Sequence, residues 1–315
     1  MATEALAADH LSKWYGSRPA LADVSFRIDR GESVAYLGPN GAGKTTTLKL
    51  LSGLTRPTSG FARVLGIYPS GERDRALVGV GTLLETPGVP PFLTGADLLS
   101  YCARVRGVPV RERPDAVRRA TDGLVAAESL RHPFGSLSTG VARRTLLASV
   151  LIGDPEILLL DEPTMGLDPA ARSDLRKILR DLVRRGKTIL LSTHLLEDVQ
   201  EVCDRVLFLR DGVLVGDEPV QPTAGPTAGG SVRTIRLRFA TPVTPESFTS
   251  LARPSLRVVW EDPRQVLVFF LGGDPEQAEL VAQTVRAGLT LIGVAVPEPD
   301  LARRYLEKVG REEAT

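Results

Sequence analysis

Cysteine is scarce in this chain of 315 residues, which has only two, Cys102 and Cys203, far apart in the sequence. Such a pair suggests no disulfide framework and favours a reducing, cytosolic compartment. Long apolar runs are also missing, because no stretch approaches the roughly 20 residues that a helix needs to span a bilayer. If the protein works at a membrane, another chain must cross it. Residues 1–4 show neither the basic nor the apolar region of a signal peptide, so we expect none.

The chain also lacks an excess of charge of one sign. It has 39 Lys and Arg against 38 Asp and Glu, a net charge of +1, so no strong field indicates nucleic acid or an anionic membrane as a partner. Residues 104–119 are Arg-rich, and we interpret them as a solvated helical face rather than a nucleic-acid patch. The hydrophobic content of 43% is ordinary for a soluble globular protein. The length allows one large domain and a small one.

The chain does contain a glycine-rich loop. Residues 38–45 read Gly-Pro-Asn-Gly-Ala-Gly-Lys-Thr, the pattern G-x-x-x-x-G-K-[ST] of a P-loop. Gly41 and Gly43 let backbone N–H groups approach phosphate oxygens where a Cβ would intrude. Lys44 supplies a positive charge for the β- and γ-phosphates, and the Thr45 hydroxyl is an oxygen ligand for Mg²⁺. A chance glycine turn is the alternative, which the predicted strand 33–37 and helix 46–54 on either side make less plausible.

The predicted nucleotide-binding residues of this loop are Gly38, Pro39, Asn40, Gly41, Ala42, Gly43, Lys44, Thr45 and Thr46.

A second pattern places two carboxylates after a buried strand. Residues 157–160 are all apolar, which is typical of a parallel strand buried on both faces, and Asp161 and Glu162 follow directly. In open α/β sheets, ligands bind at the carboxyl ends of the strands. Asp161 can hold Mg²⁺ through its water shell, and Glu162 can orient or deprotonate a water that attacks the γ-phosphate. The alternative is a pair of surface acids, which are costly to bury unless a cation compensates them.

Two further candidates lie outside these motifs. Tyr15, upstream of the P-loop, offers an aromatic face on which adenine could stack, or it is simply an aromatic residue at a strand edge. Glu85 ends the predicted strand 78–84 and is followed by a Pro/Gly loop that could move. It is a candidate Mg²⁺ ligand or a solvated loop charge.

Two loops near helices are also candidates. Ser138 and Gly140 precede a predicted helix at 142–153, where they could hold an anion or act as an ordinary N-cap. His194 stands just past the predicted buried strand 187–192. It could contact the γ-phosphate or hold the attacking water, or it is a loop histidine with ordinary partners.

The rest of the chain indicates the domain organisation. Residues 11–16 and the alternating strand 22–28 predict an antiparallel layer before the nucleotide strand. Residues 219–230, rich in Pro, Thr, Ala and Gly, are a predicted linker between an ATP-binding domain at 1–218 and an accessory domain at 231–315. The order of predicted elements in the latter is β-α-β-β-α-β, a ferredoxin-like α+β arrangement with a closing helix at 299–309. No catalytic constellation is found there.

Together these motifs, over residues 11–216, resemble the ATP-binding subunit of an ATP-binding-cassette (ABC) transporter. Residues 38–45 match Walker A, and Asp161 and Glu162 match the Walker B aspartate and catalytic glutamate. The remaining matches are the signature loop at 136–144, the D-loop at 166–168 with Asp168, the switch histidine His194 and the adenine-stacking Tyr15.

The sequence departs from the family pattern in two places. The signature loop is Leu-Ser-Gly-Gly-Gln in the family, and residues 137–141 here end in Val141, which loses an amide used near the ribose. Glu85 replaces the Q-loop glutamine, so it can still offer Mg²⁺ an oxygen but adds negative charge beside the phosphates. Residues 85–88 are similar to the loop of antibiotic-resistance exporters of the bacitracin and lantibiotic-immunity type. Residues 299–306 also look like that ABC-2 exporter branch.

The resemblance implies an α/β P-loop NTPase with an antiparallel β layer and a helical subdomain. It implies a homodimer that encloses two ATP and Mg²⁺, in which Ser138, Gly140 and Asp168 act across the interface. Thr45, Glu85 and Asp161 would serve the Mg²⁺, and Glu162 and His194 would serve hydrolysis. A bacterial membrane permease would dock near Glu85–Leu99, where residues 89–93 are apolar, and the chain would work at the cytoplasmic face of the cell membrane. The implied activity is export of a drug, antibiotic or peptide, with no nucleic-acid partner.

Two other classes of protein, a soluble ABC ATPase and a P-loop kinase, are alternatives. A soluble ABC ATPase of DNA repair would carry coiled coils between Walker A and the signature loop, and residues 46–135 show no such heptads. A translation factor of this kind would carry two cassettes, and only one is present. A P-loop kinase would leave Ser138 and His194 without a role.

Overall fold

The computed structural model describes residues 4–84, 88–220, 232–244, 257–271, 273–295, 301 and 308–309. The chain divides into two compact units, residues 1–221 with 305–315, and residues 222–304. The elements of the first unit are, in order, β1 (Glu4–Tyr15), β2 (Arg18–Asp29), β3 (Ser33–Leu37), α1 (Lys44–Leu51), β4 (Ser59–Val64), α2 (Arg73–Ala76), β5 (Val80–Leu83), α3 (Gly95–Val105), η1 (Val110–Glu112), α4 (Arg113–Thr121), η2 (Ser129–Arg131), η3 (Phe134–Ser136), α5 (Thr139–Leu151), β6 (Ile157–Asp161), α6 (Pro169–Arg184), β7 (Thr188–Thr193), α7 (Leu196–Val202), β8 (Arg205–Arg210) and β9 (Val213–Pro219).

The first unit is built on a six-stranded sheet of order β5-β6-β7-β3-β8-β9. The first five strands are parallel, and β9 pairs antiparallel with β8. Every residue of β3, β6 and β7 is buried, as a parallel sheet covered on both faces requires. The prediction of buried strands at 33–37, 157–160 and 187–192 is therefore confirmed.

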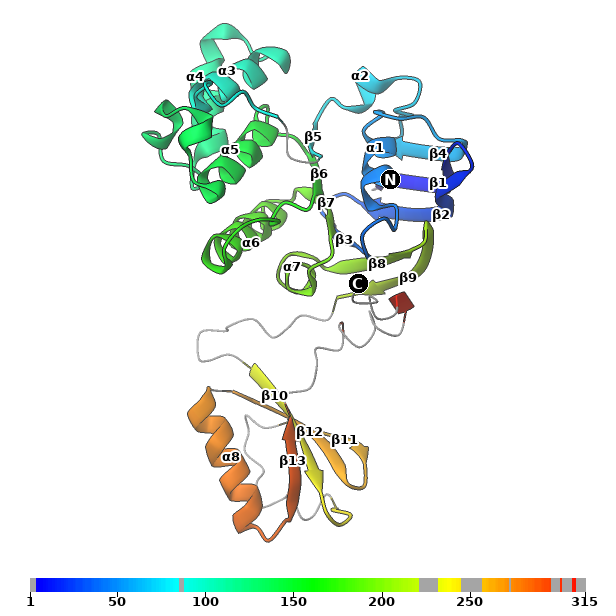
Figure 1. Cartoon of the computed structure of the whole chain (residues 1–315), viewed down its shortest axis with the longest axis vertical. Helices are drawn as coiled ribbons and strands as arrows, with labels where there is room; N and C mark the ends of the chain where they lie inside the picture. The colour runs from blue at the N-terminus through cyan, green and yellow to red at the C-terminus, as the bar shows by residue number, and fades with distance from the viewer. Residues whose placement is uncertain are drawn as a thin grey trace. The chain divides into compact units, whose positions relative to one another are not determined.

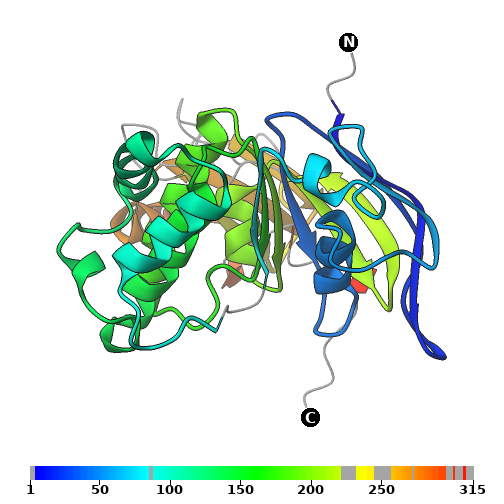
Figure 2. The same ribbon diagram turned by 90° about the horizontal axis from the view of Figure 1, so that it is seen from above.

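A second sheet covers one side of the first. It has the order β2-β1-β4 and is antiparallel throughout, which confirms the predicted antiparallel layer. Helix α1 shares one apolar core with both sheets, to which Leu48, Leu50 and Leu51 contribute. The rings of Phe26 on β2 and Tyr36 on β3 lie in the same core with their centroids 5.8 Å apart. In Figures 1 and 2 this small sheet lies on one side of the six-stranded sheet and α3–α5 lie on the other.

The helical part between β5 and β6 consists of α3, α4 and α5 with short 3-10 turns. Thr94 caps α3: its side chain accepts a hydrogen bond from Asp97 N, and the Asp97 side chain accepts one from Thr94 N. The Arg-rich residues 104–119 are not one helix. Gly107 has φ of +70° and Pro109 follows, so α3 ends at Val105 and the stretch continues in η1 and α4.

In its described residues, the second unit contains a four-stranded antiparallel sheet of order β11-β12-β10-β13 and the helix α8. Its elements are β10 (Val232–Phe239), β11 (Arg257–Asp262), β12 (Gln265–Leu271), α8 (Asp274–Arg286) and β13 (Leu291–Ala295). Ile235, Leu237 and Phe239 of β10 form its core with Val266, Val268 and Leu280. The predicted helix 245–252 lies outside the described residues, so the ferredoxin-like assignment stays a prediction.

Residues 308–309, near the end of the chain, belong to the first unit, whereas the sequence-based division, which stays a prediction, places them in the accessory domain 231–315. The reason is a set of contacts on the β8–β9 hairpin. Lys308 Nζ lies 2.9 Å from Glu218 Oε1 on β9 and 6.0 Å from the ring centroid of Phe208 on β8. Most of the predicted closing helix 299–309 lies outside the described residues.

Candidate active site

The P-loop joins β3 to α1, and it requires glycine for two reasons: a left-handed backbone conformation and close packing against neighbouring atoms. Gly41 and Gly43 have φ of +81° and +107°, in the left-handed region. A Cβ added to Gly43 would lie 2.5 Å from Ala20 O, and one added to Gly38 would lie 2.2 Å from Leu209 O. The loop is thus packed directly against its neighbours, and a side chain at Gly38 or Gly43 would force it to move.

The Lys44 ammonium lies within the turn of the loop. Its Nζ donates to Gly38 O at 2.7 Å and to Pro39 O at 3.1 Å, and only 6% of the residue is exposed. Gly43 caps α1 with no side-chain hydrogen bond, so backbone N–H groups of the first turn face the loop. Buried positive charge and N–H donors are the groups that recognise phosphate.

The parallel sheet brings the distant motifs to one edge. Leu37, the last residue of β3, lies opposite Thr193 of β7, and Asp161 at the end of β6 lies opposite Ser192. The P-loop, Asp161 and His194 therefore all follow the carboxyl ends of adjacent strands, where ligands bind in open α/β sheets.

Asp161 is hydrogen-bonded on both of its carboxylate oxygens. Thr45 Oγ1 donates to Oδ2 and Ser192 Oγ donates to Oδ1, each at 2.6 Å, and Asp161 is 4% exposed. Two hard oxygen groups, the Thr45 hydroxyl and the Asp161 carboxylate, are thus adjacent beside the loop, which suits Mg²⁺. Ser192 was not predicted as a site residue, since a serine inside a strand has no motif of its own.

Glu162 is held close to both His194 and Lys44. His194 Nδ1 lies 2.9 Å from Glu162 Oε1, and Lys44 Nζ lies 3.7 Å from the same oxygen. The Glu162 backbone has φ of +45°, a conformation that non-glycine residues adopt at a cost of roughly 1–3 kcal/mol. Sequence reasoning predicted both side chains, and the structure brings them together.

Arg143 supports the strained segment at Glu162 through hydrogen bonds to its backbone, and no sequence motif predicted this role. Its Nε donates to Pro163 O at 2.7 Å, and its guanidinium also donates to Glu162 O. Burial lowers the pKa of Arg143, while the charges of Asp161 and Glu162 raise it. Because Arg143 lies on α5, it connects the Glu162 segment to the helix that begins at the Ser138 loop.

The Ser138 loop and Asp168 are neighbours of each other. Ser138 caps α5 and accepts a hydrogen bond from Val141 N at 3.4 Å, and Asp168 caps α6 and accepts one from Ala171 N at 2.9 Å. A Cβ added to Gly140 would touch Ala171 Cβ at 3.4 Å. Both Ser138 and Asp168 are exposed, so their side chains are accessible to a partner.

Tyr15 ends β1 and is 51% exposed, with Lys13 Nζ 5.0 Å from its ring centroid. It lies in the β1–β2 hairpin, whose second strand contributes Ala20 O, the atom against which Gly43 packs. Its predicted role as the adenine-stacking residue stays a prediction. Glu85 lies outside the described residues, so its predicted role stays a prediction.

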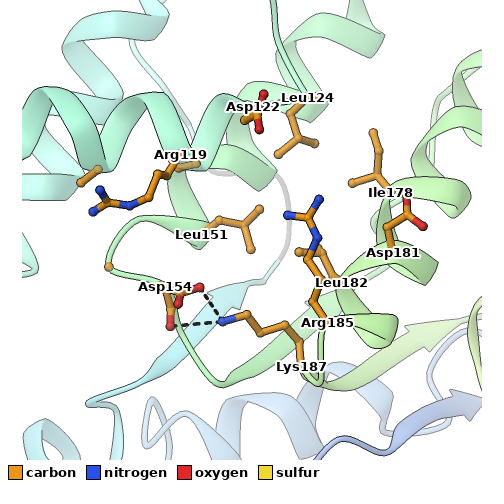
Figure 3. A pocket seen from close by; sticks show the side chains of 14 residues that line it. Arg119, Asp122, Leu124, Leu151, Asp154, Ile178, Asp181, Leu182, Arg185 and Lys187 are labelled. Carbon is orange, nitrogen blue, oxygen red and sulfur yellow. Dashed lines mark hydrogen bonds and ion pairs between the residues drawn. The ribbon is translucent and has the colours of Figure 1, made fainter.

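The structure also contains a cavity of about 330 Å³ away from this site, between α4, the end of α5 and the end of α6 (Figure 3). Leu124, Leu151 and Leu182 line it, together with the ion pair of Lys187 Nζ and Asp154 Oδ1 at 2.5 Å. Lys187 precedes β7, so the cavity lies at the amino ends of the strands rather than at the edge that carries Asp161. It is not part of the candidate active site.

Comparison with known proteins identifies the family. Residues 21–165 match the family model described as ABC transporter. The Nod factor export ATP-binding protein I of Rhizobium etli is 33% identical over 303 residues, which cover 96% of this chain and 92% of that protein. The protein of the same name from Ralstonia nicotianae is 37% identical over 214 residues, and the match covers 67% of this chain but less than two thirds, 65%, of that protein.

Solved structures agree. The structure described as the ATP-binding subunit of an ABC transporter is 29% identical, with a TM-score of 0.62 over 69% of this chain and 90% of that one. A bacterial ABC transporter cassette solved as a dimer, at 24% identity and a TM-score of 0.63 over 69% and 99%, shows the same fold. The chain belongs to the family of ABC transporter ATP-binding proteins. It is an ABC-type ATPase with the P-loop NTPase fold, as the resemblance implied.

Proposed function

We propose that this chain binds ATP with Mg²⁺ at residues 38–46 and hydrolyses it to power export through a separate membrane permease. The observation that carries the proposal is the cluster at one sheet edge, where Thr45 Oγ1 lies 2.6 Å from Asp161 Oδ2 and His194 Nδ1 lies 2.9 Å from Glu162 Oε1. Nucleotide-binding, metal-binding and water-activating groups are within reach of one triphosphate there.

The residues fit Mg²⁺ as well as ATP. Within the described ranges, no cluster of three or more His, Cys, Asp and Glu side chains could hold a metal alone. Mg²⁺ does not need such a cluster, since it keeps several waters and binds through one or two carboxylates plus substrate phosphates. We assign Thr45 and Asp161 as the protein groups, with Glu85 as a third. When bound, the ion neutralises charge on the phosphate oxygens.

Glu162 is the proposed base for hydrolysis. Its carboxylate can accept a proton from, or orient, the water that attacks the γ-phosphate. His194 Nδ1 fixes the carboxylate, and Lys44 offers positive charge on the same side. Tyr15 would stack on adenine.

A second copy of the chain would complete each site. Ser138, Gly140 and Asp168 form one exposed surface around the starts of α5 and α6. In a head-to-tail twofold dimer this surface of each copy would face the P-loop of the other, so that two ATP molecules join the copies. Hydrolysis would then remove the shared γ-phosphate contacts and let the copies part.

The permease would dock at residues 85–99. Phe92 there is 75% exposed, beside Pro90, Pro91 and Leu93, and an exposed apolar patch is a common interaction site. None of the helices that the structure describes is long and apolar enough to cross a membrane. We further propose that the permease holds the chain at the cytoplasmic face of a bacterial cell membrane.

Export is favoured by the relatives that carry export in their names. The proposed cargo, a drug, antibiotic or peptide, rests on the similarity of residues 85–88 to antibiotic-resistance exporters. The test is to purify the tagged chain from its own cells in mild detergent. An integral membrane protein that co-purifies and stimulates ATP hydrolysis supports the proposal. If ribosomes or DNA co-purify and no membrane protein does, the proposal is contradicted, and the chain is a soluble ABC ATPase instead.

A further inference from the structure

We propose that Asp198 is a positioning residue for ATP hydrolysis, because it ties the segment of Glu162 to the segment of His194. The inference rests on the roles proposed for those two residues. Asp198 lies in the first turn of α7 and is 0% exposed, although aspartate is almost never fully buried unless it is paired. The burial of this carboxylate must therefore be compensated by its hydrogen-bond and ion-pair partners.

One oxygen of Asp198 connects two strand ends. The Thr164 and Thr193 hydroxyls both donate to Asp198 Oδ2, the latter at 3.2 Å. Both threonines are 0% exposed, so neither hydroxyl can turn to water instead. Losing the carboxylate would leave two buried donors without their acceptor, which is costly.

These two threonines stand next to the groups of the active site. Thr164 is two residues after Glu162, and Thr193 directly precedes His194. Thr193 Oγ1 also accepts a hydrogen bond from Leu195 N at 3.0 Å, so it fixes the backbone on both sides of His194. The distance of 2.9 Å between His194 Nδ1 and Glu162 Oε1 therefore depends on Asp198, which holds the segments of both residues.

The strain at Glu162 makes this anchor necessary. A residue at φ of +45° keeps that conformation only if its surroundings hold it. Arg143 holds the carbonyls of Glu162 and Pro163, and Asp198 holds Thr164. The segment is thus fixed at both of its ends.

Asp198 is itself held by α6. Arg176 Nη1 lies 3.5 Å from Asp198 Oδ1 and 2.8 Å from Glu197 Oε2, and Arg176 is 6% exposed. Helix α6 begins at the Asp168 cap, so the same network reaches the surface that we assign to the second copy. A displacement at that surface would be transmitted through Arg176 and Asp198 to Glu162 and His194.

The test compares Asp198→Ala, Asp198→Asn and Thr193→Val with Asp174→Asn, an exposed Asp on α6, as the matched control. We expect kcat for ATP hydrolysis to fall about 10- to 100-fold in Asp198→Ala and less in the other two, since misplacing an assisting group by about 1 Å costs a rate factor of this size. KM for ATP and the rise in Tm on adding ATP stay within about twofold. In a His194→Ala background, Asp198→Ala adds little further loss, because both changes remove the same arrangement.

Wild-type kcat in folded Asp198→Ala would overturn the inference, and so would parallel losses of ATP binding and kcat, which indicate general damage. If Asp198→Ala does not fold, unchanged kcat in both Asp198→Asn and Thr193→Val overturns it. Glu162→Gln is measured alongside. Undiminished hydrolysis in that variant removes the proposed role of Glu162, on which the inference rests. An inactive Glu162→Gln beside fully active Asp198 and Thr193 variants removes only the positioning role of Asp198.

Discussion

His194 Nδ1 lies 2.9 Å from Glu162 Oε1 and 3.0 Å from Glu162 Oε2, although 32 positions separate the two residues in the chain. An ionised carboxylate can only accept hydrogen bonds, so Nδ1 carries the proton in this contact. Nε2 is then the imidazole atom left to face the nucleotide or the attacking water. In the proposed mechanism, the pair would set which end of the His194 imidazole faces the substrate.

Glu162→Gln should keep ATP binding and stop turnover. An amide has nearly the shape of the carboxylate but cannot take a proton from water, so we expect hydrolysis to fall by about 100-fold or more. Phosphate release measures the rate, and the rise in Tm on adding ATP measures binding. Glu128→Gln, at an exposed glutamate, is the control. Turnover near the wild-type rate would remove Glu162 from its role.

Gly43→Ala should destabilise the first unit much more than Gly66→Ala. Both glycines have positive φ, but a Cβ at Gly43 would meet Ala20 O at 2.5 Å, whereas nothing lies within 4 Å of one at Gly66. Backbone strain alone predicts a loss of about 1 kcal/mol in the free energy of unfolding for Gly66→Ala. The added clash predicts about 3 kcal/mol for Gly43→Ala. Urea denaturation compares them, and equal losses would show that the loop is not packed as described.

Phe92→Asp should separate ATP hydrolysis from permease binding. A charge in the centre of the proposed docking patch costs binding energy, while the nucleotide site is untouched. We expect the variant to lose co-purification with the permease and keep the ATPase rate of the isolated chain. Phe61→Asp, at an exposed phenylalanine on β4, is the matched control. If Phe92→Asp still co-purifies with the permease, the docking surface lies elsewhere on the chain.

Cys203 should resist alkylation in the folded protein. Burial raises the pKa of its thiol, so the reactive thiolate is scarce at pH 8, and the residue is 4% exposed. Burial also raises the pKa of Cys102, opposed by Arg106 and Ser149. Mass spectrometry of Cys102→Ser and Cys203→Ser after timed treatment with iodoacetamide separates the two thiols. The Cys203 rate should rise at least 100-fold in urea, and fast labelling of native Cys203 would contradict its burial.

Local sequence patterns could predict those active-site residues that lie within recognised motifs. The order Gly-x-x-x-x-Gly-Lys-Thr and the run of apolar residues before Asp161 are readable, because a phosphate-binding turn and a buried strand each constrain neighbouring residues. The structure places Lys44, Thr45, Asp161, Glu162 and His194 at one edge of the sheet, as the family pattern requires.

The supporting residues were not predictable in this way. Arg143, Ser192 and Asp198 act through contacts with segments 18 to 34 positions distant, so no short pattern marks them. Their signal is a buried polar side chain, which only the packed structure reveals. The contact of Lys308 with Glu218, 90 positions earlier in the chain, was not predictable either.

The central claim is that the Ser138 loop of one copy closes over the P-loop of another. We would place Asn40→Cys on one chain and Ser138→Cys on a second, in a background of Glu162→Gln with Cys102 and Cys203 replaced by serine, and oxidise the mixture with and without Mg²⁺ and ATP. The account predicts a disulfide-linked dimer only in the mixture and only with nucleotide. A chain carrying both cysteines that instead closes an internal disulfide at high dilution, while the mixture gives no linked dimer, would show that Ser138 serves its own P-loop.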